Sequence, residues 1–188
     1  MDVSVYILIG IVAVLIIGFI AMYNGLVRVR NQMKNAWAQI DVQLKRRHDL
    51  IPNLIETVKG YAKHERETLD SVTKARNLAQ AAVGTGVVAQ AKAEGELSGF
   101  LSRLLAVAEA YPDLKANQNF LALQEELSST ENKISFSRQF YNDSVLGYNN
   151  KIQMFPTNMM ANMFGFKQGE YFELEAPAER EVPKVSFS

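Results

Sequence analysis

The chain has 188 residues, of which 48% are hydrophobic and 21% are charged, so it can form a domain of ordinary size. Its 20 basic and 20 acidic side chains cancel, which argues against nucleic acid as a partner because phosphate neutralisation needs a clustered excess of Lys and Arg. The chain has no cysteine, which excludes disulfides, thiolate catalysis and cysteine-ligated zinc sites.

The first predicted element is a transmembrane anchor over residues 1–23. Residues Val3 to Tyr23, VSVYILIGIVAVLIIGFIAMY, carry no charge and match the roughly 20 apolar residues that cross a bilayer. A cleaved signal peptide would need a basic N-terminal region and a small-residue cleavage site, whereas Asp2 is the charge that precedes this stretch, so we expect a retained signal-anchor. Arg28, Arg30 and Lys34 follow it and predict a single-pass protein of the cell membrane with its N-terminus outside and its domain in the cytoplasm.

Four helical segments are predicted after the anchor, at about Tyr23–Lys59, Ala62–Ala82, Ala89–Tyr111 and Asn117–Phe155. Apolar residues recur along them at alternating spacings of three and four, as in coiled coils. Gly60 and the turns VGTGVV and YPDLK mark the breaks. Short loops make neighbouring helices antiparallel, so we predict an all-α fold with an up-and-down four-helix bundle over residues 24–156. The alternative is three long helices, the first kinked at Pro52.

A short amphipathic helix is predicted over residues 157–166. Pro156 ends the last long segment because it disfavours the helical conformation at Phe155, and Thr157 is a candidate N-cap. This helix carries apolar side chains that we expect near the membrane: Met159, Met160, Met163 and Phe164. It could lie in the lipid interface, bind a partner or cap the end of the bundle. Residues 167–188 are expected to form an extended acidic tail.

The stretch LKRRHDLIPNL, from Leu44 to Leu54, places a charge on the apolar seam. Arg47 occupies a position where leucine is expected, and an unpaired buried charge is costly. If Gly60 lies level with Asn117 in antiparallel helices, Arg47 comes level with about Thr130 or Glu131. The register therefore predicts an Arg47–Glu131 pair that fixes the alignment of the two helices.

Pro52 and the polar residues around it are candidates for interaction or structural roles. Pro52 has no N–H and crowds the carbonyl of His48, so the helix should bend there and leave that carbonyl for a side chain or water. His48 and Asp49 belong to a face that meets either water or a partner. Arg138 lies on the seam of the last long segment.

Neither histidine is predicted to form a catalytic or metal site. His48 and His64 lie sixteen residues apart without a ligand pair at helical spacing, and a single histidine on a helix is more often a half-exposed surface residue than a ligand. The sequence also has no glycine-rich phosphate loop and no nucleophile elbow. We therefore expect no enzyme and no cofactor, and keep a metal-dependent hydrolase that uses His48 or His64 as the rival.

Three blocks of the chain together resemble the LemA family. They are YNGLVRVRNQMKNAWAQIDVQLKRRHDLIPNLIETVKGYAKHE, YPDLKANQNFLALQEELSSTENKISFSRQFYNDSVLGYN and the closing PKVSF. The resemblance implies a bacterial single-pass membrane protein with a helical-bundle domain, a cell-envelope role and no established enzymatic activity.

We therefore predict a non-catalytic membrane-anchored scaffold or interaction protein. Its expected partners are the lipid bilayer through Val3–Tyr23, a membrane protein such as a membrane protease, and other copies of itself. A peripheral lipid-binding or membrane-organising module is the alternative.

Overall fold

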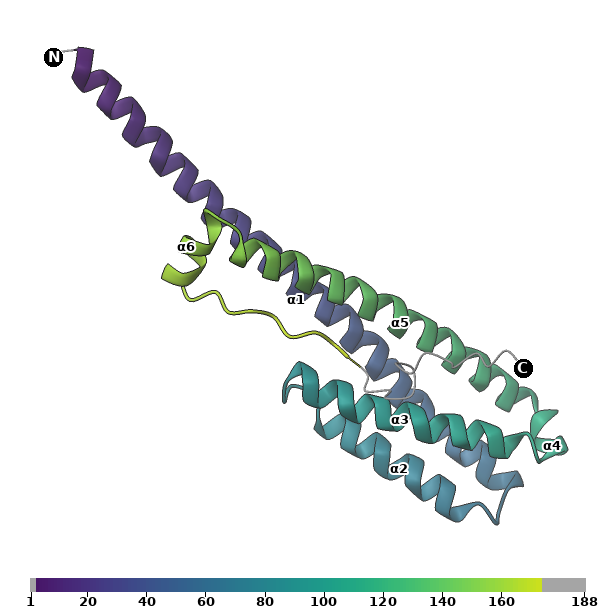
Figure 1. The fold of residues 1–188 in the computed structure, drawn as a ribbon. Helices are drawn as coiled ribbons and strands as arrows, with labels where there is room; N and C mark the ends of the chain where they lie inside the picture. The colour runs from purple at the N-terminus through teal and green to yellow at the C-terminus, as the bar shows by residue number, and fades with distance from the viewer. Residues whose placement is uncertain (1–2, 174–188) are drawn as a thin grey trace, which may run out of the picture. The chain divides into compact units, whose positions relative to one another are not determined.

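The structure, a computed structural model, describes residues 3–173, and all regular secondary structure in that range is helical. This confirms the predicted all-α class. Its helices are shown in Figure 1: α1 (Val3–Tyr61), α2 (Arg66–Ala81), α3 (Val87–Ala108), α4 (Pro112–Lys115), α5 (Gln118–Gln153) and α6 (Thr157–Met163).

The first helix includes both the predicted anchor and the segment that follows it. α1 runs without a break from Val3 and ends at Tyr61, one residue beyond the glycine at which the sequence predicts the break. The alternative of three long helices, the first kinked at Pro52, requires that first helix to continue past Gly60 into the next segment, so the end of α1 and the separate α2 contradict it. The YPDLK turn contains the short helix α4, which begins with Pro112 because proline at the first helical position sacrifices no hydrogen bond.

The chain divides into two compact units, and α1 and α5 contribute to both. Of the described residues, unit 1 contains 3–42 and 135–170, and unit 2 contains 43–134 and 171–173. The last fifteen residues, 174–188, are part of the predicted acidic tail and lie outside the described range.

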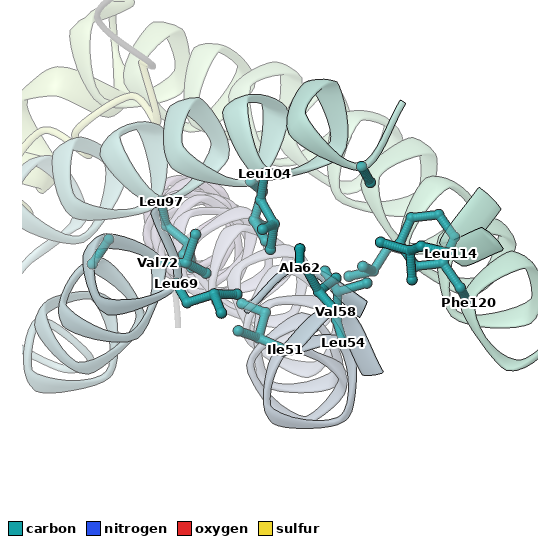
Figure 2. Packing of buried hydrophobic residues seen from close by; sticks show 14 of the residues in the cluster. Ile51, Leu54, Val58, Ala62, Leu69, Val72, Leu97, Leu104, Leu114 and Phe120 are labelled. Atoms are coloured by element: carbon teal, nitrogen blue, oxygen red, sulfur yellow. The ribbon is translucent and has the colours of Figure 1, made fainter. Parts of the chain in front are cut away.

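The core of unit 2 is built from the apolar seams of α1, α2, α3 and α5. Side chains at spacings of three and four point into it (Figure 2). Ile51, Leu54 and Val58 of α1 are fully buried, as are Val72 of α2 and Leu104 of α3. The burial of these positions explains why each segment is helical, because most helix stability comes from packing of an apolar face.

The core of unit 1 joins α1, α5 and α6. Leu26, Tyr148, Ile152, Met160 and Phe166 form one buried cluster. Phe155, which the heptad pattern places on the seam, is instead 79% exposed, because α5 already ends at Gln153.

Thr157 has a different role from the predicted one. It is the first residue of α6 and not its N-cap, which is Pro156. Its hydroxyl donates to the carbonyl of Lys151 in the last turn of α5, and it also lies 2.8 Å from the carbonyl of Met154, directly after that helix. Carbonyls in the last turn of a helix lack helical partners, so Thr157 satisfies one of them while it begins the next helix.

Residues 166–170 form an irregular strap that is held by polar side chains of α5. Asn149 holds Gly169 from both sides: its Nδ2 donates to the Gly169 carbonyl at 3.0 Å, and its Oδ1 accepts from the Gly169 N–H at 2.8 Å. The hydroxyls of Tyr148 and Tyr141 donate to the carbonyls of Lys167 and Glu170 at 2.7 and 2.8 Å. These bonds replace the secondary-structure partners that the strap backbone lacks.

Candidate functional site

A buried charge cluster in unit 2 centres on Arg47 of α1, whose side chain is 2% exposed. Its Nη1 donates to Glu131 of α5 and to Ser98 of α3, each at 2.7 Å. Its Nη2 forms an ion pair with Glu94 of α3, whose side chain is also 2% exposed. The Arg47–Glu131 contact is the one that the heptad register predicts. Arg47 of α1 thus contacts both α3 and α5, whereas the sequence predicts only its contact with α5.

His48 belongs to the same cluster, which corrects the expectation of a half-exposed surface histidine. Its side chain is 4% exposed, and its Nε2 lies 2.9 Å from Glu94 Oε1. The direction of this contact departs from that of an aligned hydrogen bond, so neither atom has a well-directed partner. The burial of His48 follows from the packing of α3 over this face of α1.

Glu94 is held in its charged form by its neighbours. Burial alone raises the pKa of its carboxyl group, but the contact with His48 and the positive charge of Arg47 outweigh burial and lower the pKa below its usual value. A carboxylate at Glu94 is the charge that the buried guanidinium of Arg47 requires.

The carbonyl of His48 has a side-chain partner, one of the two outcomes, a side chain or water, that the sequence leaves open. Pro52 is inside α1 and provides no N–H for this carbonyl. Arg76 of α2 takes that place, because its Nε donates to the His48 oxygen at 2.9 Å. One arginine thus satisfies a carbonyl in α1 and connects α2 to it.

Arg47 is one of the residues that line a groove of about 700 Å³ in unit 2. Its apolar wall comes from leucines of α3 and α5, including Leu105 and Leu121, and its polar wall includes Ser98, Glu131 and Asn132. His48 and Glu94 do not line it. A molecule in this groove would therefore contact Arg47 and Glu131 but not the histidine.

This geometry suits binding better than catalysis. An acid–base pair must reach the atom that it protonates, yet His48 and Glu94 are nearly inaccessible. Within residues 3–173 no group of three or more His, Asp or Glu side chains is arranged to hold a metal ion. His64 lies exposed in the connection between α1 and α2.

The remaining predicted polar residues are not part of the cluster. Asp49 and Pro52 are exposed on α1, and Arg138 is half-buried in unit 1. Arg46, next to Arg47, pairs with Glu126 at 2.6 Å on the surface of unit 2. Such an exposed pair contributes little to stability.

The predicted membrane-proximal residues all fall in unit 1. Arg28 and Lys34 are exposed, and the guanidinium of Arg30 lies 4.8 Å from the centre of the Phe166 ring. On α6 the methionines divide between two faces: Met160 is buried, whereas Met159 and Met163 are 66% and 63% exposed. Phe164, directly after α6, is 47% exposed.

Sequence reasoning missed Glu94, although the signal was present. Glu94 extends the buried seam of α3 toward its N-terminus at the same spacings of three and four that join Leu97, Leu101, Leu104 and Ala108. A second charge on a seam is the natural partner for Arg47. Ser98 and Arg76 lie off the seams, so the heptad pattern gives no indication of them.

Comparison with known proteins supports the relationship that the motifs suggest. The model of the LemA family matches residues 36–187. Protein LemA of Metamycoplasma hominis is 28% identical over 143 residues, which cover 76% of this chain and 65% of that protein. Magnetosome protein MamQ 2 of Paramagnetospirillum magneticum is 26% identical over 87% of this chain and 70% of its own length. Magnetosome protein MamQ of Magnetospirillum gryphiswaldense is 24% identical over 83% and 66%, respectively. The chain thus spans about two thirds of the length of these relatives, and with a family match over most of its residues it belongs to the LemA family.

Proposed function

We propose that this protein is a non-catalytic, membrane-anchored interaction protein that uses α1 both as its anchor and as a structural helix of its two units. The observation that supports the anchor is the N-terminal part of α1, where an apolar stretch long enough to cross a membrane has none of its residues buried. A soluble protein would cover such a stretch. This apolar helix and the LemA-family membership together indicate a membrane protein.

The positions of the aromatic residues agree with a bilayer span. Tyr6 and Tyr23 are separated by roughly 26 Å along the helix at 1.5 Å per residue, close to the roughly 30 Å of a hydrocarbon core. Tyrosine is enriched at both membrane interfaces. Because Arg28, Arg30 and Lys34 follow Tyr23, we place the N-terminus outside and the chain after Tyr23 in the cytoplasm.

The cysteine-free sequence makes this topology directly testable. Single cysteines at Ser4 and at Asp113 should differ in their reactivity toward a membrane-impermeant maleimide. Ser4→Cys should react in intact cells, and Asp113→Cys only after permeabilisation. The reverse labelling pattern would contradict the proposed orientation but would still be consistent with a membrane anchor. Release of the full chain from membranes by alkaline carbonate would contradict the anchor itself.

The groove beside Arg47 is our candidate for the surface that binds a partner protein. It combines leucine side chains with hydroxyl, amide and carboxylate groups, and Leu121 in its wall is 47% exposed. Apolar anchors surrounded by polar groups are typical of protein interfaces. A partner there would cover Leu121 and reach Glu131, whose side chain is 49% exposed despite its bond to Arg47.

A matched pair of variants tests the groove. Leu121→Glu places a charge in the groove, and Leu78→Glu places the same charge on α2 at a side chain that is 60% exposed and does not line it. Proteins that co-purify with the intact chain from solubilised membranes should be lost with Leu121→Glu and retained with Leu78→Glu. Equal retention by both variants would reject the groove as the binding surface.

A further inference from the structure

An exposed apolar patch in unit 1 extends from the residues directly after α5 to the residue directly after α6. It consists of Met154, Phe155, Met159, Met163 and Phe164, which are between 47% and 79% exposed. Five large apolar side chains within eleven residues form a larger exposed surface than scattered single residues do, and such patches mark interaction sites.

The helical phase of α6 shows that capping unit 1 does not explain the patch. Thr157, Met160 and Ala161 are buried and form the face of α6 that packs on the unit. Met159 and Met163 are four residues apart and therefore share the opposite face. In a helix that only caps a core, the outer face would be polar. The exposed side of α6 instead carries Met159 and Met163 beside Asn158 and Asn162.

Aromatic contacts place this patch at the end of the apolar stretch of α1. The ring of Phe164 lies 4.9 Å from that of Tyr23 and 6.0 Å from that of Phe19, measured between centroids. Phe19 and Tyr23 belong to the last turns of the apolar stretch Val3–Tyr23. Figure 1 shows α6 beside α1. The exposed apolar surface of α1 and the patch are thus continuous through Phe164.

The charges around the patch are of one sign. Residues 3–40 and 144–169 contain no Asp or Glu, and their charged residues are Arg28, Arg30, Lys34, Lys151 and Lys167. Basic side chains beside an apolar surface attract anionic lipid headgroups, at about 1 kcal/mol per residue near the membrane surface. A partner that offers both an apolar layer and negative charge at the end of a bilayer span is the lipid interface itself.

We propose that α6 and its flanking residues lie in the lipid–water interface, with Met159 and Met163 in the acyl boundary. α6 would then hold the part of unit 1 that follows the span against the bilayer, as a second membrane contact beside the anchor. Interfacial helices bury their apolar face by roughly 5–10 Å. This proposal rests on the proposed anchor, because only a span that ends at Tyr23 puts the patch at that depth.

The test measures the depth of single labels in the full chain. Single-cysteine variants carry a nitrobenzoxadiazole fluorophore and are reconstituted in phosphatidylcholine vesicles with and without phosphatidylglycerol. Lipids brominated near the headgroup or deep in the chain act as quenchers. Met163→Cys reports on the patch, Asn162→Cys on the polar side of α6, Ile11→Cys on the span and Asp70→Cys on an exposed position of α2.

We expect Met163→Cys to be quenched several-fold more by shallow bromines than Asp70→Cys, and more strongly still with phosphatidylglycerol. Asn162→Cys should be quenched less than Met163→Cys, and Ile11→Cys mainly by deep bromines. Equal quenching at Met163 and Asn162 would contradict the proposal that the side of α6 carrying Met163 faces the lipid.

Two outcomes would overturn the proposal while the anchor stands, with Ile11→Cys quenched in both. In one, Met163→Cys behaves like Asp70→Cys. In the other, it is shielded from aqueous iodide but not quenched by lipid, which would indicate a protein partner or a second copy of the chain. If Ile11→Cys itself escapes quenching, the anchor fails and this proposal fails with it.

Discussion

Double-mutant cycles on the charge cluster of unit 2 should show that Arg47 is coupled far more strongly to Glu94 than to Glu131. The variants are Arg47→Met, Glu94→Gln and Glu131→Gln, alone and in pairs with Arg47→Met. The side chains of Arg47 and Glu94 are each 2% exposed, whereas that of Glu131 is 49% exposed. Water can replace the partner of Glu131 but not that of Glu94.

The expected magnitudes follow from this difference in exposure. Removing one member of a buried pair leaves an uncompensated charge and costs about 3–5 kcal/mol, so Glu94→Gln and Arg47→Met should each lose stability on that scale. Glu131→Gln should cost at most about 1 kcal/mol, as for exposed pairs. The coupling energy of Arg47 with Glu94 should lie near the upper end of the roughly 0.5–3 kcal/mol found for contacting residues, and that with Glu131 near the lower end.

The assay is urea-induced unfolding of the full chain in detergent micelles, followed by the far-ultraviolet circular dichroism of its helices. Each variant must show the wild-type dependence of stability on urea, since a changed slope would mean that the denatured or native state had changed. Two equal couplings, or a larger one for Glu131, would refute the inference from burial. A coupling near zero for Glu131 would also remove the register-fixing role proposed for that pair.

Three further results are expected. The pKa of Glu94 is lowered in the folded state, so in acid the unfolded chain binds more protons than the folded chain, and stability should fall as pH drops below about 4.3. Glu94→Gln should flatten this fall in urea titrations at several pH values. An unchanged dependence of stability on pH in that variant would contradict the lowered pKa. Arg76→Leu should lower the free energy of unfolding by about 1–3 kcal/mol, the penalty of an unpaired buried group. The loss should be smaller in a Pro52→Ala background, where a restored N–H can reach the His48 carbonyl. Equal losses in both backgrounds would refute the inference that Arg76 replaces the N–H that Pro52 lacks. Burial raises the pKa of Tyr141 to about 12. In an absorbance titration, Tyr141→Phe should therefore remove tyrosinate signal only near that pH. Loss of signal near the usual tyrosine pKa of about 10 would contradict this.

The seams of the helices show how far periodicity alone can reach. Leu26, Ile40, Leu54 and Ile134 are all buried at the heptad spacings read from the sequence, because a helix turns every 3.6 residues whatever surrounds it. The same register argument matches Arg47 with Glu131 across two helices. Phe155 departs from it because Pro156 limits the helix, so a periodic pattern extended past the last hydrogen-bonded turn no longer describes a face.

The sequence by itself determined the all-α class, the exposed apolar stretch of α1, the break near Gly60 and the family. These depend on local properties: hydropathy, helical phase, backbone conformation at Gly and Pro, and motifs. Only the tertiary structure decided that His48 is buried, that Ser98 and Arg76 form hydrogen bonds with α1, and that α6 turns Met160 inward and Met163 outward. The physical reason is that burial of a side chain beside a seam depends on which neighbouring helix covers it, and that is set by packing between segments far apart in the chain.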